Sequence, residues 1–124
     1  MKTDARLVRD VGLHLFVRHI EDAVVVDLHG KATIGRANEL LDNQLQQLID
    51  EGCSKVLLNL TDVTQMDSSS ISSVVRAFKS LKCRGASLRL LRRRGNVRLV
   101  LETVRLMDVV PTTEDETQAI ASFH

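Results

Sequence analysis

The sequence predicts an α/β protein with one mixed β-sheet and α-helices packed mainly on one face of it. Two strand-like segments stand close together at 13–30, as they do in a hairpin, and helical and strand-like segments then alternate. Such alternation is typical of parallel strands joined by helices. The chain of 124 residues is long enough for one domain with its own core.

The first two segments have the pattern of an antiparallel pair. LHLFVRHIED, at 13–22, alternates roughly, with Leu13, Leu15 and Val17 on one side, as in an edge strand. AVVVDLHG, at 23–30, is a β-branched run that ends at Gly30. A short turn through Glu21 and Asp22 is expected to join them.

The remaining segments alternate between helix and strand. Apolar residues at helical spacing predict helices over 36–51, from about 68 to 84, over 97–104 and over 117–123. The second of these carries Ile71, Val74, Val75, Phe78 and Leu81 on one face. KVLLNL at 55–60 and ASLRLL at 86–91 are short apolar runs, typical of buried strands, and Pro111 interrupts the chain before the last helix.

The composition limits the classes of partner and the cellular location that are expected for this protein. The net charge of +1 gives no general attraction to nucleic acid or membrane. The three phenylalanines, Phe16, Phe78 and Phe123, are expected to be buried, so no exposed aromatic side chains are available to stack on bases. The N-terminus lacks the apolar run of a signal peptide, and no stretch is long and apolar enough to span a membrane. With Cys53 and Cys83 far apart, these features predict a cytoplasmic protein.

No enzymatic motif is found. The sequence has no glycine-rich phosphate loop and no Gly-x-Ser-x-Gly nucleophile turn. The histidines show no metal-ligand spacing; they are His14, His19, His29 and His124. We therefore expect no catalytic residue, no cofactor and no metal.

A basic stretch lies between Ser68 and Leu101, where no aspartate or glutamate occurs. It contains Arg76, Lys79, Lys82, Arg84, Arg89, Arg92, Arg93, Arg94 and Arg98. The stretch is either a solvated face balanced by acids elsewhere or a patch for an acidic protein, a phosphate-bearing ligand or an anionic lipid surface.

Three consecutive serines follow Asp67 at the start of the second helix, in QMDSSSISSVV. Asp67, Ser68 and Ser69 are all good helix caps, but three hydroxyls exceed what one cap requires. A helix start also tolerates a phosphate, through its dipole and free N–H groups. The run is therefore a cap, a switchable modification site or, less simply, a site for a bound phosphate or nucleotide.

Taken together, HGKATIGRANELLDNQL, KVLLNLTDVTQMDSSS, GASLRLLRRRGNVRLVLETVRLMDVV and EDETQAIASF resemble the STAS domain family over about residues 12–123, with residues 1–11 as a short N-terminal extension. A free-standing copy is most similar to the bacterial anti-sigma factor antagonists. In those proteins a serine after the aspartate is phosphorylated by an anti-sigma factor that is also a serine kinase, and the unphosphorylated form binds that partner and so releases a sigma factor. A phosphatase resets the cycle.

By position, the resemblance implies that Asp67 and Ser68 form the turn and cap and that Ser69, or else Ser68, accepts the phosphate. The implied partner-binding residues are Asp67, Ser70, Ile71, Gly30, Lys31, Thr33 and Arg76. The chain departs from the family at Ser70 and Ser72, where glycine is usual, and at Lys31, where an acid is usual. The alternative function is a non-enzymatic STAS subunit of a stress-sensing scaffold or of a lipid-transport complex. The oligomeric state is left open, a homodimer included.

Overall fold

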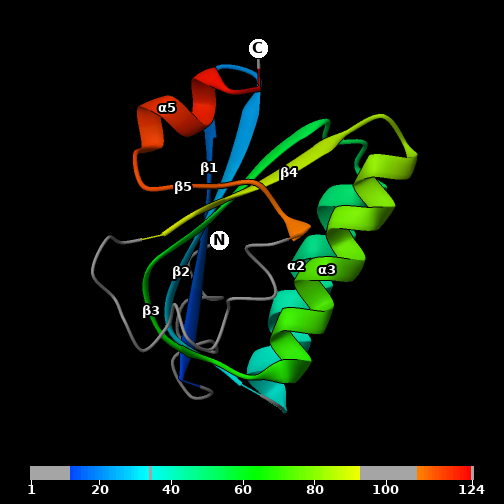
Figure 1. The fold of residues 1–124 in the computed structure, drawn as a ribbon. Coiled ribbons are helices and arrows are strands. Elements are labelled where there is room, and N and C mark those ends of the chain that lie inside the picture. The colour runs from blue at the N-terminus through cyan, green and yellow to red at the C-terminus, as the bar shows by residue number, and fades with distance from the viewer. Residues whose placement is uncertain (1–11, 34, 93–108, 124) are drawn as a thin grey trace.

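The computed structural model describes residues 12–33, 35–92 and 109–123. These residues form one five-stranded sheet in the order β1-β2-β3-β4-β5, with helices on both faces (Figure 1). The strands are β1 (Leu13–Ile20), β2 (Ala23–Ala32), β3 (Lys55–Met66), β4 (Ser87–Leu91) and β5 (Thr112–Thr113). The helices are α2 (Arg36–Asp50), α3 (Ser68–Cys83) and α5 (Glu116–Ala121).

The predicted hairpin is confirmed. β1 and β2 pair antiparallel from Leu13↔Gly30 to Ile20↔Ala23, and Glu21 and Asp22 alone form the connecting turn. Glu21 adopts a positive φ of 56°, which two-residue hairpin turns require because their twist must match that of the strands. The other three pairings, β2–β3, β3–β4 and β4–β5, are parallel, so the sheet is mixed as expected.

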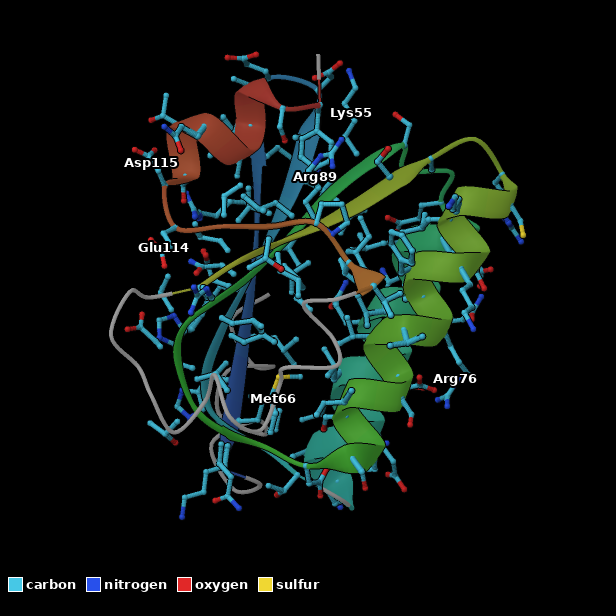
Figure 2. All side chains as sticks on the ribbon, viewed as in Figure 1. Lys55, Met66, Arg76, Arg89, Glu114 and Asp115 are labelled. Carbon is cyan, nitrogen blue, oxygen red and sulfur yellow. The ribbon has the colours of Figure 1, made fainter. Side chains whose placement is uncertain are left out.

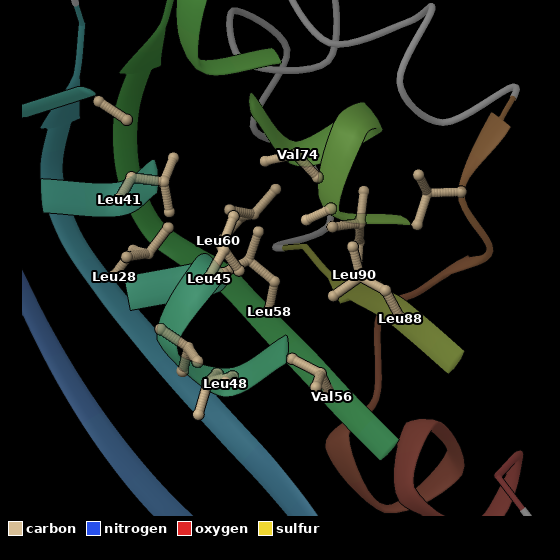
Figure 3. Close-up of a cluster of buried hydrophobic side chains, with 14 of the residues drawn as sticks. Leu28, Leu41, Leu45, Leu48, Val56, Leu58, Leu60, Val74, Leu88 and Leu90 are labelled. Carbon is tan, nitrogen blue, oxygen red and sulfur yellow. The ribbon is translucent and has the colours of Figure 1, made fainter. Parts of the chain in front are cut away.

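α2 and α3 lie side by side on one face of the sheet and cover the main core (Figure 1). Figure 3 shows leucines and valines from both helices and from β2, β3 and β4 meeting there. On the opposite face, α5 covers a smaller cluster with Ala119 and Ile120. The apolar runs of β2 and β3 are explained by this arrangement, because both faces of each strand are buried where helices cover them.

Several boundaries and positions differ from the expectation. β3 runs six residues beyond the apolar run 55–60, because Val63 and Met66 continue to face the core while the polar residues between them face outward. β5 has only two residues, too few to show a period. The last helix starts at Glu116, one residue earlier than expected, and ends at Ala121. The helix expected at 97–104 lies outside the described residues.

Phe16 was expected to be buried, and this was wrong. It is 45% exposed, and its ring meets the His29 ring edge-to-face at 5.5 Å. Phe16 points to the opposite face from the core-facing Leu13 and Leu15, because successive side chains of a strand alternate.

Candidate functional site

Asp67, the residue before the serine run, caps α3. Its backbone is extended, at φ −101°, and its carboxylate oxygen Oδ1 accepts the Ser70 N–H at 3.2 Å. The same oxygen accepts the Ser69 hydroxyl at 2.6 Å. Ser68 was expected to share in the cap, but it occupies the first position of the helix instead. Ser68, Ser69 and Ser70 are therefore the first three helical residues.

The three hydroxyls lie in three different environments. Ser68 is exposed, Ser69 is half-buried and held by Asp67, and Ser70 is completely buried. Only Ser68 and Ser69 can therefore meet a modifying enzyme or a partner without a change in the fold.

Ser70 belongs to a buried polar cluster at the junction of β2, α2 and α3. Its Oγ donates to the Ala32 carbonyl at 2.6 Å and lies 3.2 Å from Oδ1 of Asn38 in α2. Ser73 Oγ lies 3.3 Å from the same Asn38 oxygen and 3.2 Å from the Ser69 carbonyl. The expectation that Ser70 lies on the binding surface is therefore corrected: its side chain joins α3 to the rest of the domain.

This role gives a testable expectation. Replacing Ser70 with alanine removes a buried hydrogen bond, and we expect it to lower the free energy of unfolding by about 1–2 kcal/mol. Ser72→Ala is the matched control, because Ser72 is exposed on the same helix and alanine is a better helix former there. Urea unfolding of both variants checks this, and equal stabilities would show that the Ser70 hydroxyl only fills space.

The loop after β2 lies beside the start of α3. Ala32 pairs with Met66 at the carboxyl ends of the parallel strands β2 and β3, and the Asp67 N–H donates to the Ala32 carbonyl at 3.3 Å. Lys31 is exposed and Thr33 is half-buried at this edge. The structure thus brings Lys31 and Thr33 to the same edge of the sheet as Asp67, Ser68 and Ser69.

Gly30 has a structural role at this edge. Its φ is +108°, and a Cβ atom placed on it would lie 2.2 Å from the Gly12 carbonyl oxygen. That carbonyl accepts the Lys31 N–H at 2.9 Å. Only glycine allows this approach of the two chain segments.

Two of the other expected binding residues lie further along α3. Ile71 is half-buried and packs against the main core. Arg76 is exposed, pairs with Asp42 of α2 at 3.2 Å and lies 3.3 Å from Ser73 Oγ. Both side chains line a hollow of about 130 Å³ between α2 and α3. Arg76 therefore joins the two helices and lies away from the serine run (Figure 2).

A family model for the STAS domain matches residues 14–119, most of the chain. The chain belongs to the STAS domain family. A search of curated proteins found no match.

Solved structures share this STAS fold at low sequence identity. An anti-sigma factor antagonist from Mycobacterium paratuberculosis matches with a TM-score of 0.75 at 13% identity, covering 90% of this chain and 93% of that one. A putative anti-sigma factor antagonist from Thermotoga maritima matches with a TM-score of 0.72 at 23% identity, covering 88% of this chain and 93% of that one. The phosphorylated form of SpoIIAA, the Bacillus cell fate determinant, matches with a TM-score of 0.65 at 20% identity, covering 89% of this chain and 99% of that one. These likenesses establish the fold.

The basic stretch of this STAS domain is not one continuous patch among the residues that the structure describes. Arg84 donates to the Ile49 carbonyl at 3.3 Å, and Arg92 pairs with Glu114 at 2.9 Å. Arg89 donates to the Ser122 carbonyl at 3.2 Å and lies over the Phe123 ring (Figure 2). The pairs of Arg76 with Asp42 and of Arg92 with Glu114 favour the interpretation as a solvated face balanced by acids. Arg93, Arg94 and Arg98 lie outside the described residues.

One polar cluster was missed in the sequence. Asp27, in the middle of β2, accepts both Arg18 Nε (2.5 Å) and Arg18 Nη2 (3.0 Å), and Asn59 Nδ2 donates to it at 2.6 Å. Arg18 also donates to Glu116 at 2.8 Å, so the cluster joins β1, β2 and β3 to α5. An acid inside the run VVVDL was the available signal, since a buried carboxylate needs partners.

The environment of Asp27 sets its protonation. Burial alone raises the pKa of its carboxyl, but hydrogen bonds from Arg18 and Asn59 and the Arg18 charge outweigh this effect and hold the pKa below its ordinary value. The same contacts raise the pKa of the Arg18 guanidinium. Both groups are therefore charged at neutral pH.

In the ranges 12–33, 35–92 and 109–123, no three histidine, cysteine, aspartate or glutamate side chains gather closely enough to hold a metal ion. No helix within those ranges is long and apolar enough to cross a membrane.

Proposed function

We propose that this STAS domain is an anti-sigma factor antagonist-like binding module whose partner is an anti-sigma factor with serine kinase activity. Binding is switched by phosphorylation of Ser69, with Ser68 as the second choice, and a phosphatase restores the binding form. The observation that carries the proposal is the Ser69 hydroxyl: it is partly accessible, at the second position of α3, and held 2.6 Å from the Asp67 carboxylate. The domain itself catalyses no step.

The start of α3 suits a phosphate that leaves the fold intact. A phosphate on Ser69 carries about −1.5 to −2 charges at neutral pH. The helix dipole and the first-turn N–H groups favour that charge by about 0.3–1 kcal/mol. The modification also removes the hydrogen that Ser69 donates to Asp67, and it sets two negative groups side by side. The loss is confined to one partly exposed contact and is small against the 5–15 kcal/mol that typically stabilises a domain, so the fold is expected to survive.

The effect on a partner is larger than the effect on the fold. A partner that docks on the start of α3 and on the adjacent β2 edge must remove water from this surface. An unmatched dianion there costs several kcal/mol, because its hydration is lost without replacement. Phosphorylation is therefore expected to release the partner.

The names of the similar structures support the proposed class of partner. All three similar proteins are described as anti-sigma factor antagonists, one of them as putative, and SpoIIAA was also solved in a phosphorylated form. A chain with this fold thus exists as a phosphoprotein. Sequence identities of 13–23% establish a shared fold but not a shared partner, so the partner of this chain is part of the proposal.

The direct test is phosphorylation in vitro. The protein is incubated with ATP and a serine-kinase anti-sigma factor encoded near its gene, and the site is mapped by mass spectrometry. We expect one phosphate on Ser69, lost in Ser69→Ala and kept in the matched control Ser72→Ala. Phosphate found on Ser68 alone would move the acceptor by one residue.

A charge at position 69 should imitate the switch. Ser69→Asp is expected to weaken binding to the anti-sigma factor at least tenfold, while the melting temperature stays within about 5 °C of the parent. Ser80→Asp adds the same charge at an exposed site about three turns along α3, away from the proposed docking surface, and should bind like the parent. Calorimetric titration and thermal unfolding measure both effects, and a collapse of the fold in Ser69→Asp would mean that the hydroxyl serves mainly as part of the cap.

An unphosphorylated protein would point to the other function. If no kinase from the gene neighbourhood adds phosphate, the domain is better explained as a STAS subunit of a stress-sensing scaffold or of a lipid-transport complex. Affinity purification would then recover scaffold proteins, or an ATPase or permease subunit, in place of an anti-sigma factor.

A further inference from the structure

The outer edge of β1 has the features of a pairing surface. Within the described ranges, β1 is the first strand of the sheet, and β2 is its only neighbour. Three large hydrophobic side chains are exposed in those ranges, and two of them, Phe16 (45%) and Val17 (40%), are adjacent on β1. Exposed apolar residues on an eight-residue edge strand favour pairing with another strand.

The hairpin determines which backbone groups face outward. A two-residue turn closes on a hydrogen-bonded pair, here Ile20 and Ala23. Hydrogen-bonded and non-hydrogen-bonded pairs alternate along an antiparallel ladder, so the even-numbered residues of β1 bond to β2. The N–H and C=O groups of the odd-numbered residues, Leu13, Leu15, Val17 and His19, therefore point away from the sheet.

We propose that β1 pairs antiparallel with β1 of a second copy of this chain, with Phe16 on the two-fold axis. In this register Phe16 lies opposite Phe16 of the second copy, Leu15 lies opposite Val17, and Leu13 lies opposite His19. The outward-facing residues then form four hydrogen-bonded pairs, and two five-stranded sheets become one continuous sheet. The proposal is independent of the phosphorylation of Ser69.

Side-chain matching selects this register. Both exposed hydrophobic residues gain apolar partners, since the two Phe16 rings meet across a non-hydrogen-bonded pair, where side chains are closest. Moving the axis to Val17 would place Phe16 opposite Arg18 and Leu15 opposite His19. In the chosen register Arg18 lies opposite His14, but its guanidinium is already held by Asp27 and Glu116 of its own copy.

A second copy fits this edge better than an open chain of copies. The other described edge of the sheet, β5, has two residues and offers β1 too short a partner for head-to-tail growth. A two-fold pairing is closed, because each copy uses the same edge. The start of α3 remains available in both copies, because α3 packs against α2 and β4.

Cysteine cross-linking tests the register. In a Cys53→Ser/Cys83→Ser background, Phe16→Cys places the two new thiols opposite each other, with Cα atoms about 4.5 Å apart, which suits a disulfide. We expect a disulfide-linked dimer under mild oxidation. His14→Cys is the matched control and should form no disulfide-linked dimer, because residue 14 lies opposite Arg18 and not opposite residue 14 of the second copy. Cross-linking through Val17→Cys with none through Phe16→Cys would overturn the register.

Sedimentation tests the dimer itself. The parent should show a monomer–dimer equilibrium that depends on concentration, and Val17→Lys should shift it at least tenfold toward the monomer. Val109→Lys is the matched control, since Val109 is similarly exposed (45%, against 40% for Val17) but lies outside β1, and it should dimerise like the parent. A monomeric parent at all concentrations, or an equal loss in both variants, would overturn the proposal.

Discussion

Replacing Gly30 with alanine is expected to destabilise the domain by about 3 kcal/mol or more. The new Cβ would lie 2.2 Å from the Gly12 carbonyl oxygen, a backbone atom that cannot rotate away. The residue would also keep a φ of +108°, which is strained for any side chain. The β1–β2 pairing and the adjacent loop would have to move together to relieve both effects.

Gly52→Ala is the control that separates these two causes. Gly52 has a φ of +79°, but nothing lies within 4 Å of its Cβ position. Its substitution should cost only the backbone strain, about 1–2 kcal/mol. Chemical unfolding of both variants gives the difference, and equal losses would show that the close approach of Gly12 has no role in stability.

Asp27→Asn is expected to lower the free energy of unfolding by about 2–3 kcal/mol. The change keeps the shape of the side chain but removes the negative charge to which Arg18 and Asn59 donate hydrogen bonds. The effect is large because the Asp27 side chain is only 13% exposed. Asp42→Asn is the matched control, because it breaks the Arg76 ion pair on the surface, where the Asp42 side chain is 47% exposed. A surface pair is worth about 1 kcal/mol at most.

The pH dependence of this difference provides a second check. The pKa of Asp27 is lower in the folded protein than its ordinary value of about 3.9. Its stabilising contribution is therefore complete above that value and is lost as pH falls through the folded pKa. The stability gap between parent and Asp27→Asn should be constant near neutrality and shrink below about pH 4. A gap that persists at low pH would mean that the carboxylate charge is not what stabilises the cluster.

The strand and helix types could be predicted wherever a segment is buried, on one face or on both, over several residues. The leucines of α2 and the β-branched run of β2 are examples, since Leu41, Leu45 and Leu48 are all buried on one stripe. The extension of β3 to Met66 and the short β5 could not be predicted. In those places the strands are defined by the neighbouring strands with which they pair. The local sequence is too short or too irregular to show the two-residue alternation of a strand.

The candidate site could be predicted in its position but not in its details. The run Asp67–Ser70 marks a helix start through its capping residues alone. Which serine faces water and which is buried depends on Ala32 and Asn38, which lie far away in the sequence. For the same reason Ser70 was assigned to the binding surface, whereas the structure places it inside the domain.

The Asp27 cluster shows a related limit. A single acid in an apolar strand indicates a buried charge, but its partners come from β1, β3 and α5. Only the strand register reveals them. Sequence patterns therefore identify the need for a partner, and tertiary structure identifies the partner.

The central claim, a binding module switched at the start of α3, is tested most directly by one titration. The same preparation of protein is titrated into the serine-kinase anti-sigma factor before and after phosphorylation, with the site of the phosphate confirmed by mass spectrometry. We expect tight binding before modification and at least a tenfold loss of affinity afterwards, with the melting temperature nearly unchanged. Equal affinity of the two forms, with phosphate present on Ser69, would contradict the central claim.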